Sequence, residues 1–331
     1  MKALTLCGID VGATELVIAT STDGKPTSLT TFPNTSQGHK SLIKRLTKSG
    51  RSARVCMEAT GIYHFELALS LSRTKRIEVS VVNPRAIKSF AGARLQRAKT
   101  DKVDANLLLD YVTTMPFKAW EEPDQKIVEL QCIARRMVQL ADLSTQEKNR
   151  LHASEYKSSA AEMIQASIQR IIESLQDCCS ELEQKALEII KADKELKEVF
   201  DLITSITGFA EKSTIKLMAE ILWLPKDMRP EQWVAHAGLD PKPFESGSSI
   251  NKHRSISRMG NKYLRTSLYM PALTAKMYDP HVKAFYDKLV AAGKKKKQAL
   301  VAVMRKLLRA IWGMLHYKRP WDGSKFYVVS A

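Results

Sequence analysis

The sequence predicts an α/β domain with a mixed sheet (residues 1–122), then a long α-helical coiled coil (123–200), then a mainly α-helical domain (201–331). Three observations support this division. Strand-like and helix-like runs alternate up to about residue 120, which is typical of helices packed on a sheet. Glycine and proline are absent from residues 124–200. The last part regains glycine and is rich in basic residues.

The first domain is expected to begin with a β-hairpin. The β-prone runs "ALTLCGID" (3–10) and "ELVIATST" (15–22) flank "VGAT", and the second run ends in the turn "DGK" (23–25). A third strand is expected in "PTSLTTFPN" (26–34). We then expect a helix at 38–50, a strand at 54–60, a helix at 63–72, a strand at 78–83 and a helix at 100–114.

The middle region is expected to form two long helices joined near "YKSSA" (156–160). Apolar or small residues there follow a four-three alternation that only Lys185 interrupts: Ile164, Ile168, Ile171, Leu175, Cys178, Leu182, Ile189, Ala192, Leu196 and Val199. This spacing predicts a coiled coil of roughly five heptads. Such a helical hairpin favours self-association.

The last region is expected to contain a turn and helix in "ITGFAEKSTIKLMAEI" (206–221) and a basic amphipathic helix in "KKKKQALVAVMRKLLRAIWGML" (294–315). The inward residues of the second helix are Leu300, Met304, Leu307, Leu308, Ile311 and Leu315. Its basic run is equally consistent with a solvated face and with contact to phosphates.

The formal net charge is +17 and the pI is near 9.6. This excess predicts a polyanionic partner. Nucleic acid is favoured over a membrane, because no apolar run approaches the roughly 18 residues of a membrane span. The five cysteines form no CxxC pair and the seven histidines lack metal-ligand spacing. These patterns argue against disulfides and zinc, and for a reducing cytoplasm.

Four carboxylates of the first domain stand in unusual positions. Asp10 closes an apolar run, and Glu58 lies within the apolar run "RVCMEATG". Asp101 and Asp104 are three apart in "KTDKVDA", which places them on one face of a helix. A carboxylate in an apolar strand is costly unless it is paired or binds a metal. Carboxylate oxygens suit Mg²⁺ or Mn²⁺, and two such ions roughly 4 Å apart can clamp a phosphodiester.

Structural interpretations of the same acids stay open. Asp101 can be an N-cap with Asp104 in the first turn, where the helix dipole favours negative charge. Asp10 can be a turn residue at the end of a strand, and Glu58 can pair with an arginine. Each acid alone is a weak signal, and the set together favours a site for two divalent ions.

The stretch "GIDVGAT" (8–14) is also similar to the first phosphate loop of actin-like and sugar-kinase ATPases. A second glycine-rich nucleotide loop and a Walker loop are not found in the sequence. We therefore expect no nucleotide cofactor. The same hairpin begins the ribonuclease-H-like nucleases, and that interpretation is favoured.

Six motifs occur in order along the chain: "GIDVGAT", "MEATGIY", "VVNP", "KTDKVDA", "GLDPKPFESGSS" and "SRMGNKYLRTSLYMPAL". Together they resemble the DEDD-type insertion-sequence transposases related to the Piv invertase, a family of bridge-RNA-guided DNA recombinases. The resemblance covers nearly the full length. It implies a RuvC-like (ribonuclease-H-like) first domain and a separate transposase domain at the C-terminal end.

The resemblance also implies roles for individual residues. Asp10, Glu58, Asp101 and Asp104 fall on the family's catalytic, metal-holding acids, and Ser246 falls on its nucleophile. In the family this serine attacks a DNA phosphodiester and forms a phosphoserine link while a 3′-hydroxyl leaves. Strand exchange then passes through a Holliday-junction-like intermediate.

The partners that the resemblance implies are double-stranded donor and target DNA and a noncoding bridge RNA. Further copies of the chain are also implied, as a dimer joined by the coiled coil and as a tetramer, a dimer of dimers, in the synaptic complex. The active sites would be composite between subunits. The implied location is the bacterial cytoplasm, at the nucleoid when DNA is bound.

The stretch "PKPFESGSSINKHR" (241–254) has the composition of a surface loop. The resemblance selects Ser246 in it over Ser248 and Ser249. Basic residues in and after the loop, which can hold a DNA backbone or only carry surface charge, are Lys252, Arg254, Arg258, Lys262 and Arg265.

Two other functions stay open at this point. A junction-resolving nuclease would use the four acids with activated water and would not need the serine. A basic coiled-coil scaffold that binds RNA would need neither the four acids nor the serine. The chain also departs from the family pattern at Thr207 and Ala210, in "ITGFAEKS", outside the catalytic set.

Overall fold

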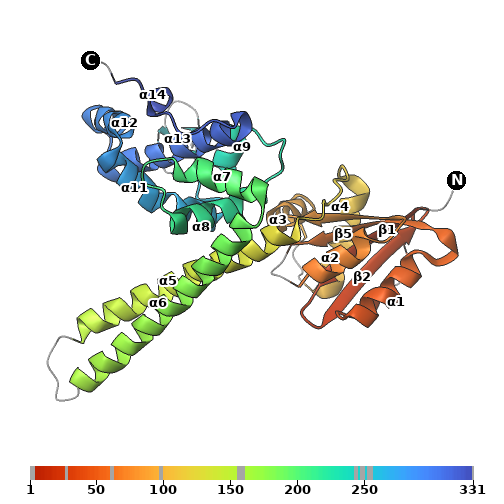
Figure 1. Cartoon of the computed structure of the whole chain (residues 1–331). Helices are drawn as coiled ribbons and strands as arrows, with labels where there is room; N and C mark the ends of the chain where they lie inside the picture. Colours follow the sequence, from red (N-terminus) through yellow and green to blue (C-terminus); the bar gives the residue numbers. More distant parts are fainter. Residues whose placement is uncertain are drawn as a thin grey trace. The chain divides into compact units, whose positions relative to one another are not determined.

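The computed structural model describes residues 4–26, 29–59, 63–96, 100–154, 161–241, 245–246, 250–251 and 256–329. The chain divides into two compact units, Met1–Glu122 and Pro123–Ala331 (Figure 1). The predicted first domain coincides in extent with the first unit. The predicted coiled-coil region and C-terminal domain both fall in the second unit.

The first unit is built on a mixed six-stranded sheet in the order β3-β2-β1-β5-β6, with β4 also paired to β2. The hairpin partners β1 and β2 are antiparallel, whereas β1, β5 and β6 run parallel. The strands are β1 (Leu4–Val11), β2 (Glu15–Thr22), β3 (Lys25–Pro26), β4 (Thr30–Pro33), β5 (Ser52–Glu58) and β6 (Ile77–Val82). This sheet confirms the predicted α/β class and fits a ribonuclease-H-like fold.

Among the described residues of this unit, four α-helices and one 3₁₀ helix accompany the strands, and two of the α-helices follow the last strand. They are α1 (Ser36–Leu46), η1 (Lys48–Gly50), α2 (Phe65–Ser72), α3 (Pro84–Ala93) and α4 (Asp101–Thr114). Sequence analysis missed α3, although Asn83 caps it by accepting a hydrogen bond from Arg85 N and Pro84 occupies its first turn. This pair of residues is a common helix start.

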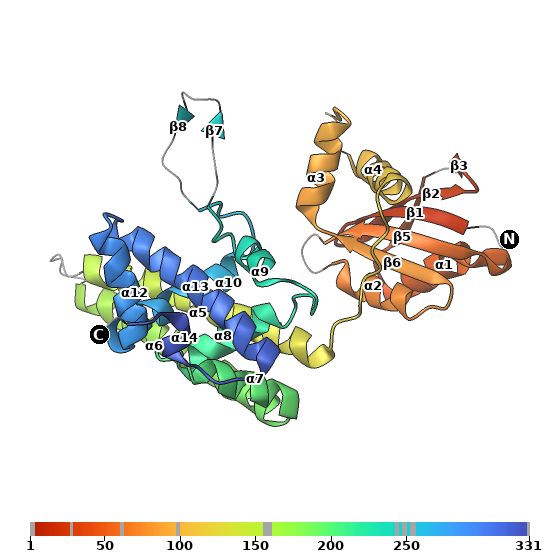
Figure 2. The same cartoon turned by 90° about the horizontal axis from the view of Figure 1, so that it is seen from above.

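The sheet carries a separate apolar core on each face. Side chains alternate between the two faces along a strand, so β2 directs Leu16 and Ile18 into one core and Val17 and Ala19 into the other. The helices α1 and α2 complete the first core, and α3 and α4 complete the second. Figure 2 shows these helix pairs on opposite sides of the sheet.

Helix α4 approaches β1 very closely at Gly8. A Cβ atom at this position would lie 2.2 Å from Leu109 N and 2.4 Å from Ala105 O, so a larger residue would push the helix away from the strand. Gly8 thus sets the distance between β1, which carries Asp10, and the helix that carries the predicted aspartate pair.

The second unit is helical apart from one short antiparallel strand pair. Its elements are α5 (Gln125–Ala153), α6 (Ala161–Lys191), α7 (Lys194–Thr204), α8 (Glu211–Ile221), α9 (Pro230–His236), β7 (Glu245–Ser246), β8 (Ile250–Asn251), α10 (Lys262–Ser267), α11 (Tyr269–Tyr278), α12 (Pro280–Ala291), α13 (Lys296–Tyr317) and α14 (Gly323–Phe326). One continuous core joins the first turns of α5 and the last turns of α6 to the helices that follow.

The predicted pair of long helices is present as α5 and α6, which lie side by side (Figure 1). The predicted seam is not confirmed as one continuous coiled coil. Helix α6 ends at Lys191, and Asp193 caps a new helix by accepting hydrogen bonds from Glu195 N and Leu196 N. Sequence periodicity missed this break because the apolar rhythm continues across it.

The face of α6 that packs inward overlaps the predicted seam only in part. Leu182 and Ile189 of the seam pack against the core, whereas Ile164 and Ile171 are each 45% exposed. Ile172, which lies outside the predicted seam, is buried. Both faces carry apolar residues at helical spacing, so periodicity alone could not choose between them.

Within the described residues, none of the helices is long and apolar enough to span a membrane.

Candidate active site

Asp10 and Glu58 lie at the carboxyl ends of two neighbouring strands. Asp10 is the last but one residue of β1, and Glu58 ends β5. The two strands are parallel and in register, with Ile9 opposite Met57. Both carboxylates therefore lie at the same edge of the sheet, and both are partly buried.

Asp101 and Asp104 lie in the first turn of α4, which packs on β1 and β2. The N-cap is Thr100, whose Oγ1 accepts a hydrogen bond from Val103 N at 3.3 Å. The alternative that Asp101 itself is the N-cap is therefore wrong. The positive end of the helix dipole still stabilises both negative charges.

The pKa of Asp10 responds to the other three carboxylates. Burial is the largest cause that raises the pKa of Asp10 from 3.8 to about 6, followed by repulsion from Asp104, Asp101 and Glu58. The Val11 backbone amide opposes this shift. The fold has thus brought the two strand acids and the helix pair into one electrostatic cluster, which we call the acidic cluster.

The acidic cluster is not a closed metal shell. Among the residues that the structure describes, no group of three or more Asp, Glu, His or Cys side chains is arranged to hold a metal ion. The four negative charges repel one another, which favours keeping the carboxylates apart. An opposite charge between them would relieve this repulsion. By donor type, the four carboxylates suit a hard divalent cation.

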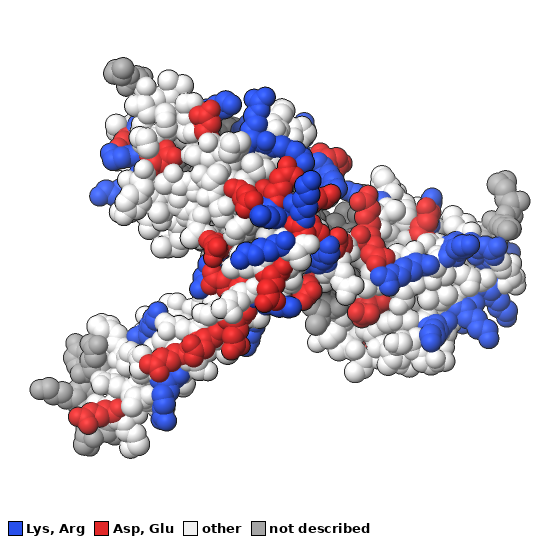
Figure 3. All heavy atoms as spheres, in the orientation of Figure 1, with Lys and Arg blue, Asp and Glu red and all other residues white. Residues whose placement is uncertain are grey.

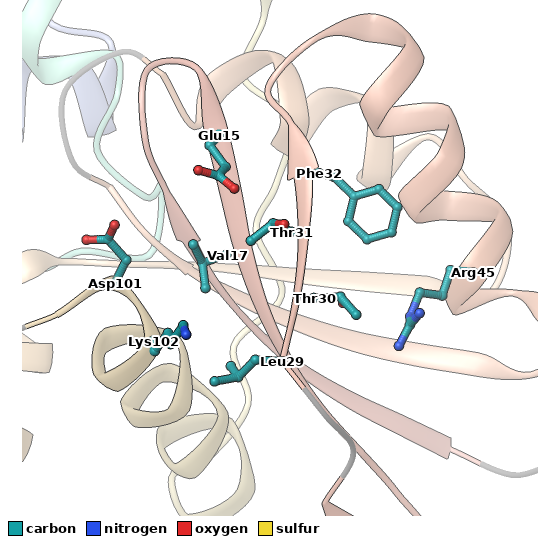
Figure 4. A pocket seen from close by; sticks show the side chains of 9 residues that line it. All are labelled: Glu15, Val17, Leu29, Thr30, Thr31, Phe32, Arg45, Asp101 and Lys102. Atoms are coloured by element: carbon teal, nitrogen blue, oxygen red, sulfur yellow. The ribbon is translucent and has the colours of Figure 1, made fainter.

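A pocket of about 740 Å³ opens beside the acidic cluster, and Asp101 is part of its wall. Its lining residues are Glu15, Val17, Leu29, Thr30, Thr31, Phe32, Arg45, Asp101 and Lys102. In Figure 4, Glu15 and Asp101 lie on one side of the pocket and Arg45 on the other. The start of α4 is therefore open to an incoming polar molecule.

Ser246 belongs to the second unit, on strand β7, opposite Ile250 of β8. Its side chain lies outside the described residues. Figure 2 shows the β7–β8 pair apart from the helices of this unit. We call the stretch 241–256, which contains this pair, the arm. The stretch that composition predicts to be a plain loop therefore contains a short strand pair.

The arm begins at a hydrogen-bonded stem. Ser257 N donates to Asp240 O at 2.8 Å, and Ser257 Oγ donates to Asp240 Oδ1 at 2.6 Å. Arg258 N donates to Gly238 O at 3.1 Å. These contacts hold the two ends of the arm together at the helical body.

The predicted nucleic-acid contacts have different surroundings. Lys252 and Arg254 lie outside the described residues. Arg258 and Lys262 are exposed, and so are available to a phosphate. Arg265 is partly buried, and its Nη1 donates a hydrogen bond to Ala237 O at 2.7 Å. One donor of Arg265 is therefore already used within the protein.

A buried carboxylate that sequence analysis missed holds this region together. Glu220 is 2% exposed and accepts hydrogen bonds from Arg135 Nε at 2.8 Å, Arg135 Nη2 at 3.0 Å and Asn261 Nδ2 at 2.6 Å. It thereby links α5, α8 and the start of α10. The signal was present in the sequence, since Glu220 interrupts the apolar run "LMAEI".

Comparison with known proteins places both units in one family. A DEDD transposase model, described as "Transposase", matches residues 7–154, and the model "Transposase IS116/IS110/IS902 family" matches residues 200–287. The pilin gene-inverting protein of Moraxella bovis is 28% identical over 296 residues, which is 88% of this chain and 90% of that protein. Its counterpart from Moraxella lacunata matches to the same extent. An uncharacterized 42 kDa protein of the insertion element IS900 from Mycobacterium paratuberculosis is 34% identical over 79 residues, 24% of this chain and 20% of that protein.

The chain belongs to the IS116/IS110/IS902 family of transposases.

The matched regions of this transposase contain its candidate site residues. The first region includes Asp10, Glu58, Asp101 and Asp104, and the second includes Ser246. A member of this family is a DNA transposase or recombinase, so the chain is an enzyme that acts on DNA.

Proposed function

We propose that this transposase cuts and rejoins DNA through a covalent link to Ser246, with the acidic cluster holding Mg²⁺ or Mn²⁺. The observation that carries the proposal is the acidic cluster itself. Four carboxylates from two strands and one helix gather at one edge of the sheet, and three of them raise the pKa of the fourth. Such repulsion is costly without a compensating cation.

The residues that would hold the ions are Asp10, Glu58, Asp101 and Asp104. When bound there, a divalent ion polarises the phosphodiester and stabilises the charge that builds up on it. Two ions are the number we propose, because four carboxylates can serve two hard cations. The first turn of α4 presents Asp101 toward the pocket, where a DNA strand can approach.

In the proposed reaction the Ser246 hydroxyl oxygen bonds to the phosphorus of one DNA phosphodiester. The bond from phosphorus to the 3′-oxygen breaks, and that oxygen leaves as a 3′-hydroxyl carrying a proton. The phosphoserine ester keeps the energy of the broken bond, so a 3′-hydroxyl of another strand can displace the serine without ATP. Strand exchange through a Holliday-junction-like intermediate follows from repeating these two steps.

The stem and arm support this role for Ser246. A serine is a weak nucleophile and must be presented to an activated phosphate. The hydrogen-bonded stem holds both ends of the arm at the helical body, which would give the serine a defined base from which to meet DNA. Arg258 and Lys262, just beyond the stem, are exposed cations suited to the DNA backbone.

We propose, from the same resemblance, that a noncoding bridge RNA pairs with donor and target DNA and so selects both. The +17 net charge suits a protein that holds RNA and DNA together. On the face shown in Figure 3, acidic and basic side chains are mixed over α5 and α6. That face of the helix pair is therefore a weak candidate for a nucleic-acid surface.

We also propose that the chain acts as a dimer, and as a dimer of dimers when two DNA sites are joined. Ile164 and Ile171 of α6 are half exposed and one heptad apart. This stripe is suited to pack against a second copy of the chain.

The test is detection of a protein–DNA adduct on denaturing gels, using full-length protein, copurified RNA and labelled donor DNA. Ser246→Ala is expected to abolish the adduct, because the attacking oxygen is removed. Ser249→Ala, a matched change in the same arm, is expected to retain it. Asp10→Asn is expected to lose both adduct and cleavage.

A different result would identify another chemistry. Cleavage that persists in Ser246→Ala and is lost in Asp10→Asn would indicate a nuclease that uses activated water. An adduct that survives Ser246→Ala would mean that another residue is the nucleophile.

A further inference from the structure

We propose that Asn34 is a positioning residue for the acidic cluster, and that His39 sets the orientation of its amide. The inference rests on the proposed metal-holding role of the four acids. The two loops that follow the strand acids Asp10 and Glu58 have no direct sequence connection. Asn34 joins them.

The junction is a single side-chain amide. Asn34 Nδ2 donates to Gly12 O at 2.9 Å and to Tyr63 O at 3.3 Å. Gly12 lies two residues after Asp10, and Tyr63 lies five residues after Glu58. One amide group therefore links the chain beyond β1 to the chain beyond β5.

The backbone of Asn34 adds a second tie to the same hairpin loop. Asn34 N donates to Thr14 O at 2.8 Å, and Gly12 N donates to Glu15 O at 2.9 Å. The loop between β1 and β2 is thus closed on itself and held by Asn34 at both Gly12 and Thr14. Movement of this loop would carry the end of β1, where Asp10 lies.

His39 fixes which way the Asn34 amide faces. His39 Nε2 lies 2.8 Å from Asn34 Oδ1. An amide oxygen only accepts hydrogen bonds, so His39 Nε2 must carry the proton and donate. That bond directs the amide nitrogen of Asn34, with both its hydrogens, toward the two loops.

The position of His39 is itself well defined. Its side chain is 5% exposed. Burial lowers its pKa, although Glu66 opposes the shift, so the neutral imidazole is the favoured form. A Cβ atom at Gly38 would lie 1.9 Å from Pro33 O. Only glycine lets the first turn of α1 come this close to the end of β4 and place the imidazole against Asn34.

The arrangement predicts a role in holding the metal-binding geometry rather than in chemistry. Asn34 and His39 do not belong to the acidic cluster. Removing a group that orients metal ligands typically weakens metal affinity by about tenfold or more. Loss of the bridge would loosen the chain just beyond both strand acids, and a divalent ion held by the acidic cluster would then bind less tightly.

The test is a Mn²⁺ titration of the full-length chain, free of nucleic acid, followed by electron paramagnetic resonance of the unbound ion. Asn34→Ala and His39→Leu are each expected to weaken Mn²⁺ binding about tenfold. His39→Gln is expected to restore affinity to within about twofold, because its side-chain amide can donate from nearly the position of Nε2.

Thr35→Ala is the matched control for a loss of stability. Thr35 caps the same helix by accepting a hydrogen bond from Gly38 N at 3.2 Å, and its loss lowers the melting temperature without touching the Asn34 amide. Mn²⁺ affinity is expected to be unchanged in this variant. Equal weakening in Thr35→Ala, or no difference between His39→Leu and His39→Gln, would overturn the inference.

Asp10→Asn separates this inference from the proposed function. If Asp10→Asn loses Mn²⁺ binding and Asn34→Ala retains it, only the bridge is wrong. If the wild-type chain binds Mn²⁺ no better than Asp10→Asn, the proposed metal centre is wrong and the inference fails with it. If Asn34→Ala does not fold, the comparison of the two His39 variants decides the question.

Discussion

Asp10 combines a structural cost with a proposed function. It lies at the end of an apolar strand, where burial and three neighbouring carboxylates raise its pKa to about 6. Burial and repulsion make a charged aspartate at this position less favourable for stability than an uncharged residue. A group of carboxylates with a raised pKa is typical of a functional site, and either protonation or an opposite charge relieves the repulsion.

The first prediction concerns the pH dependence of stability. The folded pKa of Asp10, about 6, exceeds its ordinary value of 3.8. Between these values the native state binds more protons than the unfolded state, so stability falls as pH rises from about 4 to about 6. In metal-free buffer, Asp10→Asn is expected to melt at a higher temperature than wild type at pH 8, and the difference is expected to shrink toward pH 4. Calorimetry at these two pH values checks this, and a constant or inverted difference would contradict it.

The same four acids show how far single residues could be predicted. Asp10 and Glu58 were recognisable because a charge in an apolar run is conspicuous. The spacing of three residues between Asp101 and Asp104 predicted that they lie on one face of a helix. Their mutual proximity could not be read from the sequence, because it depends on the parallel pairing of β1 with β5 and on the close approach of α4.

At the scale of elements, Glu220 is the tie that joins three helices of the second unit. Its carboxylate is buried, and the guanidinium of Arg135 also lies 4.9 Å from the centre of the Tyr263 ring. Asn261 uses its amide nitrogen on Glu220 and its oxygen to cap α10. The position of α10, and with it the base of the arm, therefore depends on one carboxylate.

The second prediction follows from this tie. Glu220→Ala leaves the partly buried donors of Arg135 and Asn261 without their acceptor and is expected to lower the free energy of unfolding by about 2 kcal/mol. Glu220→Gln keeps an acceptor for Asn261 and is expected to cost about half as much. The control is Asp287→Ala, which breaks an exposed pair with Lys283 at 2.7 Å and is expected to cost about 0.5 kcal/mol. Urea unfolding measures all three, and equal costs in Glu220→Ala and Asp287→Ala would contradict the role of Glu220.

The elements themselves were largely predictable. The strand 15–22 and the helices near 206–221 and 294–315 were found because their apolar periodicity is strong and local. The interruption between α6 and α7 was missed because Asp193 caps a helix within an unbroken apolar rhythm. Helix α3 was missed although its start signal, Asn83 and Pro84, and its amphipathic spacing are both present in the sequence.

At the scale of the whole molecule, the chain consists of two units with separate cores. The acidic cluster and the bridge of Asn34 belong to the first unit, and Ser246 belongs to the second. Neither unit by itself contains all the residues that the proposed reaction needs. The proposed reaction therefore needs residues of both units.

The third prediction concerns association of the whole chain. The double variant Ile164→Glu and Ile171→Glu places like charges on the exposed stripe of α6 and is expected to shift a dimer to monomer. Gln176→Glu adds a charge elsewhere on the same helix and is the control. Sedimentation equilibrium gives the masses, and a dimer that persists in the double variant would place the interface elsewhere.

The sequence by itself determined the α/β class of the first unit and the helical character of the second, and it singled out the four acids and the serine as candidate site residues. These follow from local properties, namely periodicity, charges in apolar runs and short motifs. The tertiary structure decided that the acids form one cluster, which face of α6 packs inward, and that Glu220 and Asn34 join distant segments. Those features are contacts between residues far apart in the chain, and only folding determines which of them meet.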